Sequence, residues 1–243
     1  MSLFHVHYWS PALQKQSGAL IIVPDGEGPF RVVYQLHGLS DDYTIWPRRT
    51  SIERYAEKIG LMVVLLDGAR SFYVDTHPAP GRYESHILES VRFVDRTFRT
   101  IPAPAGRAIG GLSMGGYGAM KIGLKYPDLF GAVASHSGAL DILARRDESL
   151  CPELAVIFPD GPRPDEDPFA LAARPGRKPA LYFDCGVDDF LLEDNRRFHA
   201  HLTELGVAHT YKEFPGTHCW EYWDTHLTAA LLFHARKLAA RPA

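Results

Sequence analysis

Ser113 lies in the pattern Gly-x-Ser-x-Gly, with Gly111 before it and Gly115 after it. An apolar run precedes this pattern, and residues 117–124 form a run that is compatible with a helix. A strand, a sharp turn and a helix would hold the serine on a strained elbow, where glycines are needed because the backbone crowds its neighbours. The pattern therefore predicts a nucleophilic serine. A glycine-rich turn with an incidental serine is the alternative interpretation.

A serine hydroxyl needs an adjacent base to accept its proton, and a carboxylate must orient that base. Among twelve histidines, only His218 follows a predicted strand and precedes a predicted helix, in a loop flanked by proline and glycine. Asp188 and Asp189 lie in the loop after another predicted strand, whereas Asp184 is expected within that strand. The order Ser…Asp…His is that of α/β-hydrolases. Spacing alone does not separate Asp188 from Asp189.

The negative charge that develops on a substrate carbonyl needs hydrogen-bond donors. In this arrangement one donor is the backbone N–H of the residue after the nucleophile, here Met114. The second is expected from the loop after an early central strand, where Leu39 is the candidate. Gly38 would let the backbone approach the substrate closely.

Strands alternate with helices along the chain, which indicates βαβ units and a mostly parallel sheet. The active site of such a sheet lies at the carboxyl ends of its strands, where all of the candidate residues fall. Besides the strand before Ser113, strands are predicted at residues 3–9, 19–23, 31–36, 61–66, 130–135, 180–183 and 209–214. Besides the helix from the elbow to Tyr126, helices are predicted at residues 51–59, 82–98, 195–205 and 220–238.

The bulk properties fit one globular domain over residues 1–243. Residues 138–177 contain repeated prolines, and we interpret them as a short cap-like insertion over one end of the sheet. A net charge of −3 gives no indication of a nucleic-acid partner, and no apolar run reaches the length of a membrane span. No signal peptide is visible, and three cysteines without a paired framework favour a reduced, cytoplasmic setting.

Other chemistries have weaker support in the sequence. There is no His-Glu-x-x-His pattern, and His199 and His201 stand two apart on a predicted helix, so their rings face apart. No metal site and no cofactor are therefore predicted. Cys219 beside His218 is a rival nucleophile, but no base and orienting acid accompany it, so we interpret it as a packed cysteine.

The chain resembles the esterase D group of α/β-hydrolases, which includes S-formylglutathione hydrolases, and most closely the small bacterial tributyrin-type esterases. The elbow at residues 111–116 and the oxyanion loop at residues 36–40 carry the resemblance, which spans nearly the whole chain in order. Further similar segments are residues 46–54, 71–75, 167–169, 185–191 and 215–220. Aligning the Cys-Gly-x-x-Asp-Phe-Leu segment selects Asp189 as the acid.

This resemblance implies a cofactor-free serine carboxylesterase that acts on short acyl esters of small molecules and forms a homo-oligomer. It also implies a pocket lined by Gly38, Trp46, Tyr73, Phe190 and Trp220. An S-formylglutathione hydrolase is an alternative, although Ser40-Asp41-Asp42 replaces the Cys-Thr-type continuation of that branch. A feruloyl-type esterase, an acyltransferase to a sugar and a non-catalytic ligand-binding relative are further alternatives.

Overall fold

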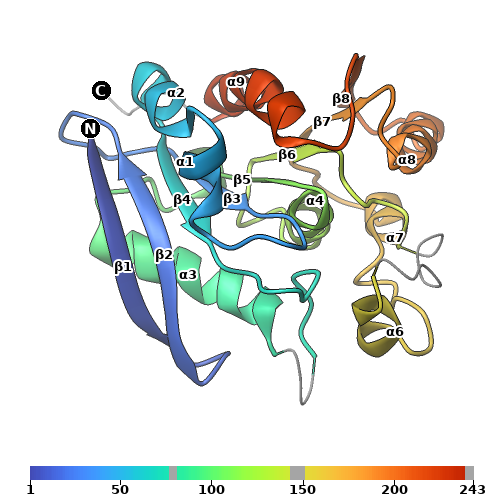
Figure 1. The fold of residues 1–243 in the computed structure, drawn as a ribbon, viewed down its shortest axis with the longest axis horizontal. Helices are drawn as coiled ribbons and strands as arrows, with labels where there is room; N and C mark the ends of the chain where they lie inside the picture. Colours follow the sequence, from blue (N-terminus) through green and yellow to red (C-terminus); the bar gives the residue numbers. More distant parts are fainter. Residues whose placement is uncertain (77–80, 143–150, 239–243) are drawn as a thin grey trace.

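The computed structural model describes residues 1–76, 81–142 and 151–238. Eight strands form one sheet in the order β1-β2-β4-β3-β5-β6-β7-β8 (Figure 1). The β1–β2 and β2–β4 pairs are antiparallel, and all pairs from β4 to β8 are parallel. The strands are β1 Ser2–Ser10, β2 Lys15–Val23, β3 Val32–Leu36, β4 Met62–Leu66, β5 Arg107–Leu112, β6 Ala132–His136, β7 Ala180–Gly186 and β8 His209–Phe214. The predicted mostly parallel α/β sheet is confirmed.

Helices cover both faces of the sheet (Figure 1). Apolar side chains of α3, α4, α7 and α8 share one core cluster, and those of α1, α2 and α9 share the other. The described helices are α1 Ile45–Arg49, α2 Ile52–Ile59, α3 Tyr83–Thr97, η1 Pro104–Gly106, α4 Met114–Lys125, α6 Glu153–Ile157, α7 Pro168–Ala173, α8 Leu192–Glu204 and α9 Trp220–Lys237.

The central strands are apolar along their length because neighbouring side chains enter opposite cores. In β3, Tyr34 packs in the cluster with α3 and α4, whereas Val33 packs in the cluster with α9. The same alternation holds in β4, where Val64 joins the first cluster and Val63 the second. This arrangement confirms the expectation that residues 61–66 form a strand covered on both faces.

The parallel strands bring four loops to one edge of the sheet. Strands β3, β5, β7 and β8 all run in the same direction, so the segments that follow them meet at their carboxyl ends. Because β7 extends to Gly186, Asp184 lies within that strand, as expected. The proline-rich segment contributes α6 and α7 beyond Cys151, while residues 143–150 of it lie outside the described residues.

Two further findings concern membrane-spanning helices and the state of the cysteines. Among the described helices, none is long and apolar enough to cross a membrane. All three cysteines are free thiols, with Cys185 buried and Cys151 and Cys219 partly exposed.

Candidate active site

Ser113 lies on a sharp turn between β5 and α4, with φ 53° and ψ −119°. This left-handed backbone is costly for a residue with a side chain, and it is held by close backbone packing on both sides. A Cβ atom at Gly111 would lie 2.3 Å from the carbonyl oxygen of Gly115. A Cβ atom at Gly115 would lie 2.5 Å from the carbonyl oxygen of Leu36. The two glycines of the motif therefore allow the elbow to pack against β3 and against itself.

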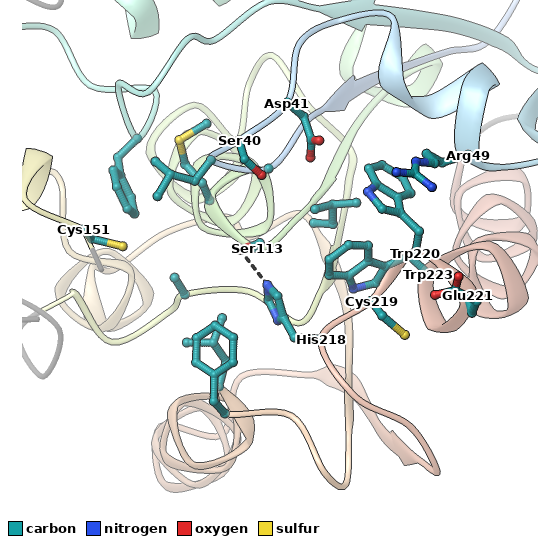
Figure 2. Close-up of a pocket in the computed structure, with 18 of the residues that line it drawn as sticks. Ser40, Asp41, Arg49, Ser113, Cys151, His218, Cys219, Trp220, Glu221 and Trp223 are labelled. Atoms are coloured by element: carbon teal, nitrogen blue, oxygen red, sulfur yellow. Dashed lines mark hydrogen bonds between the residues drawn. The ribbon is translucent and has the colours of Figure 1, made fainter. Parts of the chain in front are cut away.

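Three predicted residues form a hydrogen-bonded series at this edge of the sheet. The Nε2 atom of His218 lies 3.0 Å from Oγ of Ser113 (Figure 2). On the other side of the ring, Nδ1 of His218 lies 2.9 Å from Oδ2 of Asp189 and 3.0 Å from its Oδ1. The sheet thus brings together Ser113 after β5, Asp189 after β7 and His218 after β8, with His218 between the other two.

Asp189 is held as a carboxylate by the groups around it. Burial by itself raises the pKa of Asp189, but hydrogen bonds from His218, the Leu191 backbone and the Ser137 hydroxyl outweigh it and lower the pKa. The Leu191 N–H donates to Oδ1 at 2.8 Å. The side chain therefore stays negatively charged and can fix the orientation of the imidazole.

The two other aspartates near this strand have different surroundings. Asp188 is exposed, and its backbone N–H donates to the carbonyl oxygen of Gly216 at 3.0 Å. Asp184 is fully buried, where it accepts a hydrogen bond of 2.9 Å from the Tyr222 hydroxyl and contacts Nδ1 of His136. Only Asp189 of the three contacts His218.

The predicted oxyanion donors are the backbone N–H groups of Leu39 and Met114. Leu39 and Met114 both line the cavity that contains Ser113. Among the described residues, neither N–H donates a hydrogen bond. The Met114 N–H is also the first of α4, where the helix dipole favours negative charge. These groups can stabilise an oxygen anion near Ser113.

A cavity of about 510 Å³ opens over Ser113 and His218. Cys151 lies to one side of this pair in Figure 2, while Arg49, Trp220 and Glu221 lie to the opposite side. Leu154, whose N–H donates to the carbonyl oxygen of Cys151 at 3.0 Å, also lines the cavity, and it shares one apolar core cluster with the lining residues Phe72, Ala139 and Leu191. The cavity thus joins an apolar side and a polar side across the serine.

Three of the five predicted pocket residues line this cavity, namely Gly38, Phe190 and Trp220. The ring centroid of Phe190 lies 4.5 Å from that of His218, and the Phe190 side chain is largely exposed. The expectation for Trp46 and Tyr73 is corrected, because both are fully buried and neither lines the cavity. Instead, their polar atoms donate to carbonyl oxygens of the segment before Leu39.

Some residues around the site were missed by sequence reasoning. Ser137, in the segment after β6, has its hydroxyl close to Asp189 and accepts a hydrogen bond of 3.2 Å from the Trp223 indole. Its position at a strand end was a usable signal, because the other candidate residues share that position. Arg49, Phe72 and Leu154 also line the cavity but carried no such signal. No cluster of three or more metal-ligating side chains occurs within residues 1–76, 81–142 and 151–238.

Comparisons with known proteins identify the family of this chain. Residues 10–234 match the model of the Esterase family, described as "Putative esterase". An acetyl esterase of Caldicellulosiruptor saccharolyticus is 28% identical, covering 95% of this chain and 97% of its own. The substrate-bound serine hydrolase FphF of Staphylococcus aureus is 27% identical with a TM-score of 0.90, covering 96% of this chain and 98% of its own. The S-formylglutathione hydrolase FrmB of the same organism is 27% identical with a TM-score of 0.87, covering 97% and 100%.

Proposed function

Because this chain belongs to the Esterase family, we propose that it hydrolyses short-chain acyl esters through an acyl-enzyme on Ser113. The family, the acetyl esterase relative and the serine hydrolase neighbour make the chain a carboxylic ester hydrolase. The roles of single residues are our proposal, and the observation that carries them is the series of contacts from Ser113 through His218 to Asp189.

In the acylation step, Oγ of Ser113 attacks the ester carbonyl carbon while Nε2 of His218 accepts the hydroxyl proton. The 3.0 Å contact supports this role, because a proton can pass directly over such a distance. Asp189 accepts a hydrogen bond from Nδ1, which keeps Nε2 free of a proton at the start and stabilises the imidazolium that forms. The C–O bond to the alcohol then breaks, and the imidazolium gives its proton to the leaving oxygen.

In the deacylation step, a water molecule gives a proton to His218, and the oxygen of that water attacks the acyl carbon. The bond to Ser113 then breaks, and the proton returns from His218 to the serine oxygen. Each step passes through a tetrahedral oxyanion, which the backbone N–H groups of Leu39 and Met114 would hold. Loss of one such donor typically costs about 3 kcal/mol in the transition state.

The two sides of the cavity suggest how an ester would lie across the serine. We assign the acyl group to the apolar side near Phe72 and Leu154, since alkyl groups gain free energy there by leaving water. The alcohol would then lie toward Arg49, Trp220 and Glu221. We also keep the proposal that residues 138–177 act as a cap within a single domain of residues 1–243.

The test is a Ser113→Ala variant assayed on p-nitrophenyl acetate, together with fluorophosphonate labelling of the unmodified protein. We expect one phosphonyl adduct, located on Ser113 by peptide mapping, and loss of turnover in the variant. Circular dichroism of the variant should be unchanged. Labelling at another residue, or turnover that survives the substitution, would contradict the proposal.

A thioesterase is the second candidate, because FrmB shares this fold at 27% identity. The same steps would release a thiol from an acyl thioester. Comparing kcat/KM on S-formylglutathione and on p-nitrophenyl acetate separates the two functions. A thioester rate far below the ester rate would reject this candidate.

The setting of the enzyme is part of the proposal. Three free thiols are compatible with a reducing, cytoplasmic compartment, where disulfides are rare. A homo-oligomer is proposed from the family resemblance, and light scattering of the purified protein would test it. We expect the partner of this enzyme to be a small ester, with no nucleic acid involved.

A further inference from the structure

The loop that carries Leu39 is held from behind by buried side chains. The carbonyl oxygen of Leu36 accepts a hydrogen bond of 3.3 Å from the Trp46 indole. The carbonyl oxygen of His37 accepts a hydrogen bond of 3.0 Å from the Tyr73 hydroxyl. The carbonyl oxygen of Gly38 lies 2.7 Å from Nδ1 of the His37 ring. Three successive peptide groups before the proposed oxyanion donor therefore each contact a fully buried side chain.

Contacts on the two ring nitrogens assign the tautomer of His37. A backbone amide can only donate, and the N–H of Gly68 points at Nε2 of His37 at 2.9 Å. Nε2 is therefore the acceptor, and Nδ1 carries the proton that is donated to the carbonyl oxygen of Gly38. A second proton on Nε2 would point at the Gly68 N–H, which is also a donor. The Oδ1 atom of Asp67 lies 3.4 Å from Nε2, farther than the Gly68 nitrogen. These contacts thus place the ring proton on Nδ1.

The Gly68 amide is itself fixed by packing in the loop after β4. A Cβ atom at Gly68 would lie 2.2 Å from the Tyr73 ring, so the backbone there rests directly on that ring. The Ser71 hydroxyl donates to the carbonyl oxygen of Gly68 at 2.5 Å. The acceptor side of His37 is consequently held by the loop after β4, whose Tyr73 also contacts the His37 carbonyl oxygen.

The carbonyl of Gly38 and the N–H of Leu39 belong to the same peptide group. That group is planar, and in the trans form its C=O and N–H point in opposite directions. A hydrogen bond that draws the Gly38 oxygen toward His37 therefore turns the Leu39 N–H the other way. Leu39 and Ser113 line the same cavity, so the orientation of this one peptide decides whether its N–H can reach the oxyanion.

We propose that His37 is a positioning residue that orients the Gly38–Leu39 peptide for oxyanion stabilisation. Its imidazole connects the Gly68 amide on one side to the Gly38 carbonyl on the other. The inference rests on the proposed function, because it assigns a cause to the orientation of a donor in the same site. It requires the Nδ1–H tautomer, since the other tautomer leaves the Gly38 carbonyl without this donor.

Two substitutions separate the donor half of the ring from the acceptor half. In His37→Asn the side-chain amide can occupy the Nδ1 position and still donate to the Gly38 carbonyl. In His37→Gln the amide reaches the Nε2 position, so it can accept from Gly68 but offers no donor at Nδ1. Both changes replace the ring by a neutral amide, which makes them a matched pair.

We expect His37→Gln to lower kcat on p-nitrophenyl acetate by about 10- to 100-fold with little change in KM, because losing an oxyanion donor outright costs about 10²- to 10³-fold. His37→Asn should keep most of kcat. The affinity for a trifluoromethyl ketone, whose hemiketal oxygen needs the same donors, should fall in parallel with kcat. Equal losses in both variants, or a change in KM alone, would overturn the proposal.

Nitrogen-15 NMR of the unmodified protein tests the tautomer without relying on a variant that folds. Ring couplings near neutral pH should show the proton of His37 on Nδ1 and a bare Nε2. An Nδ1 without a proton would overturn the proposal whatever the kinetics show. Failure of the proposed function is recognised separately, since the unmodified protein would then neither react with a fluorophosphonate nor hydrolyse esters.

Discussion

The proposed catalytic centre has two halves that are built in different ways. The elbow half contains Ser113 and Met114, and it is fixed by backbone groups in close contact, as at Gly115. The other half contains His218 and Asp189, which lie on loops and meet through side-chain hydrogen bonds. The His218 side chain is 18% exposed, whereas its carboxylate partner is fully buried. Steric fit fixes the first half, while charge and hydrogen bonding fix the second.

This difference predicts different responses to substitution. A change in the elbow half should lower stability and activity together, because the packing that places the serine also holds β3 against α4. A change in the His218–Asp189 half should lower activity with little effect on folding.

Asp189→Asn should give the largest effect, a loss of about 10⁴-fold in kcat with a nearly unchanged Tm. An amide at this position can donate to Nδ1, which would place the imidazole proton on Nε2, where it blocks acceptance from Ser113. Steady-state kinetics on p-nitrophenyl acetate and a thermal melt measure the two quantities. Asp188→Asn is the matched control and should stay within a few-fold of the unmodified enzyme. The reverse order of losses would reassign the acid to Asp188.

Lys121→Met tests the elbow half through its supporting helix. The Nζ atom of Lys121, on α4, lies 2.7 Å from carboxylate oxygens of both Glu84 and Glu166 and 2.6 Å from the Tyr73 carbonyl oxygen. Because the substitution leaves two buried carboxylates without this cation, the free energy of unfolding should fall by about 3–5 kcal/mol. Urea denaturation measures the free energy of unfolding, and the activity of the variant should fall together with its stability.

The pH dependence gives a further check on Lys121. Burial raises the pKa of Glu84, but Lys121 and its neighbours outweigh burial and lower it. The stabilisation from this pair is therefore present above the unfolded pKa of Glu84 and is lost as the pH falls. The difference in the free energy of unfolding between Lys121→Met and the unmodified protein should therefore become smaller in acid. Lys125→Met, in which the replaced side chain is partly exposed, is the control with a smaller loss; an equal loss would count against the special position of Lys121.

Gly115→Ala tests the close backbone contact itself. The added methyl group would lie 2.5 Å from the Leu36 oxygen and 2.6 Å from the His37 oxygen, which belong to rigid backbone. We expect a loss of about 3 kcal/mol in the free energy of unfolding and a lower kcat, because overpacking forces the backbone apart. At Gly60 a Cβ would have no neighbour within 4 Å, so Gly60→Ala should cost only about 1–2 kcal/mol for its left-handed φ. Equal Tm values for the two variants would refute the steric argument.

His234→Leu should have the smallest effect near neutral pH. This buried histidine of α9 lies against β5, the strand before the elbow, and neither ring nitrogen has a partner among the described residues. Burial lowers the pKa of His234 from 6.5 to about 3. The unfolded chain therefore binds a proton below pH 6.5 that the folded protein excludes, and stability falls as the pH drops from there toward 3.

At neutral pH, His234→Leu should change the free energy of unfolding by less than about 1 kcal/mol, because a neutral ring without partners is replaced by an apolar group. Between pH 6.5 and about 3 the variant should lose stability less steeply than the unmodified protein. Urea denaturation at several pH values measures the slope. Substituting the exposed His7 by alanine should leave that slope unchanged; an identical slope in His234→Leu would show that the buried ring is not its source.

Most of the fold was predictable because its strands carry local signals. Strands were predicted at residues 31–36, 61–66 and 209–214, each within one residue of the bounds of β3, β4 and β8. The helix after β7 was predicted to begin at Asn195, yet α8 begins three residues earlier, at Leu192. Charged residues in that first turn obscured its start. Lys121 was invisible to sequence reasoning, since a lysine in a helix is ordinarily exposed and its two carboxylate partners are distant in the chain.

By itself, the sequence determined the class of sheet, the serine on its elbow and the histidine, because each depends on local periodicity or on position after a strand. Spacing left Asp188 and Asp189 equivalent, and only the resemblance favoured Asp189. Tertiary structure decided that Asp189 is the carboxylate in contact with His218, and that Trp46 and Tyr73 stand behind the oxyanion loop rather than in the pocket. The physical reason is that these contacts join segments far apart in the chain, and their direction depends on how loops from different strands pack.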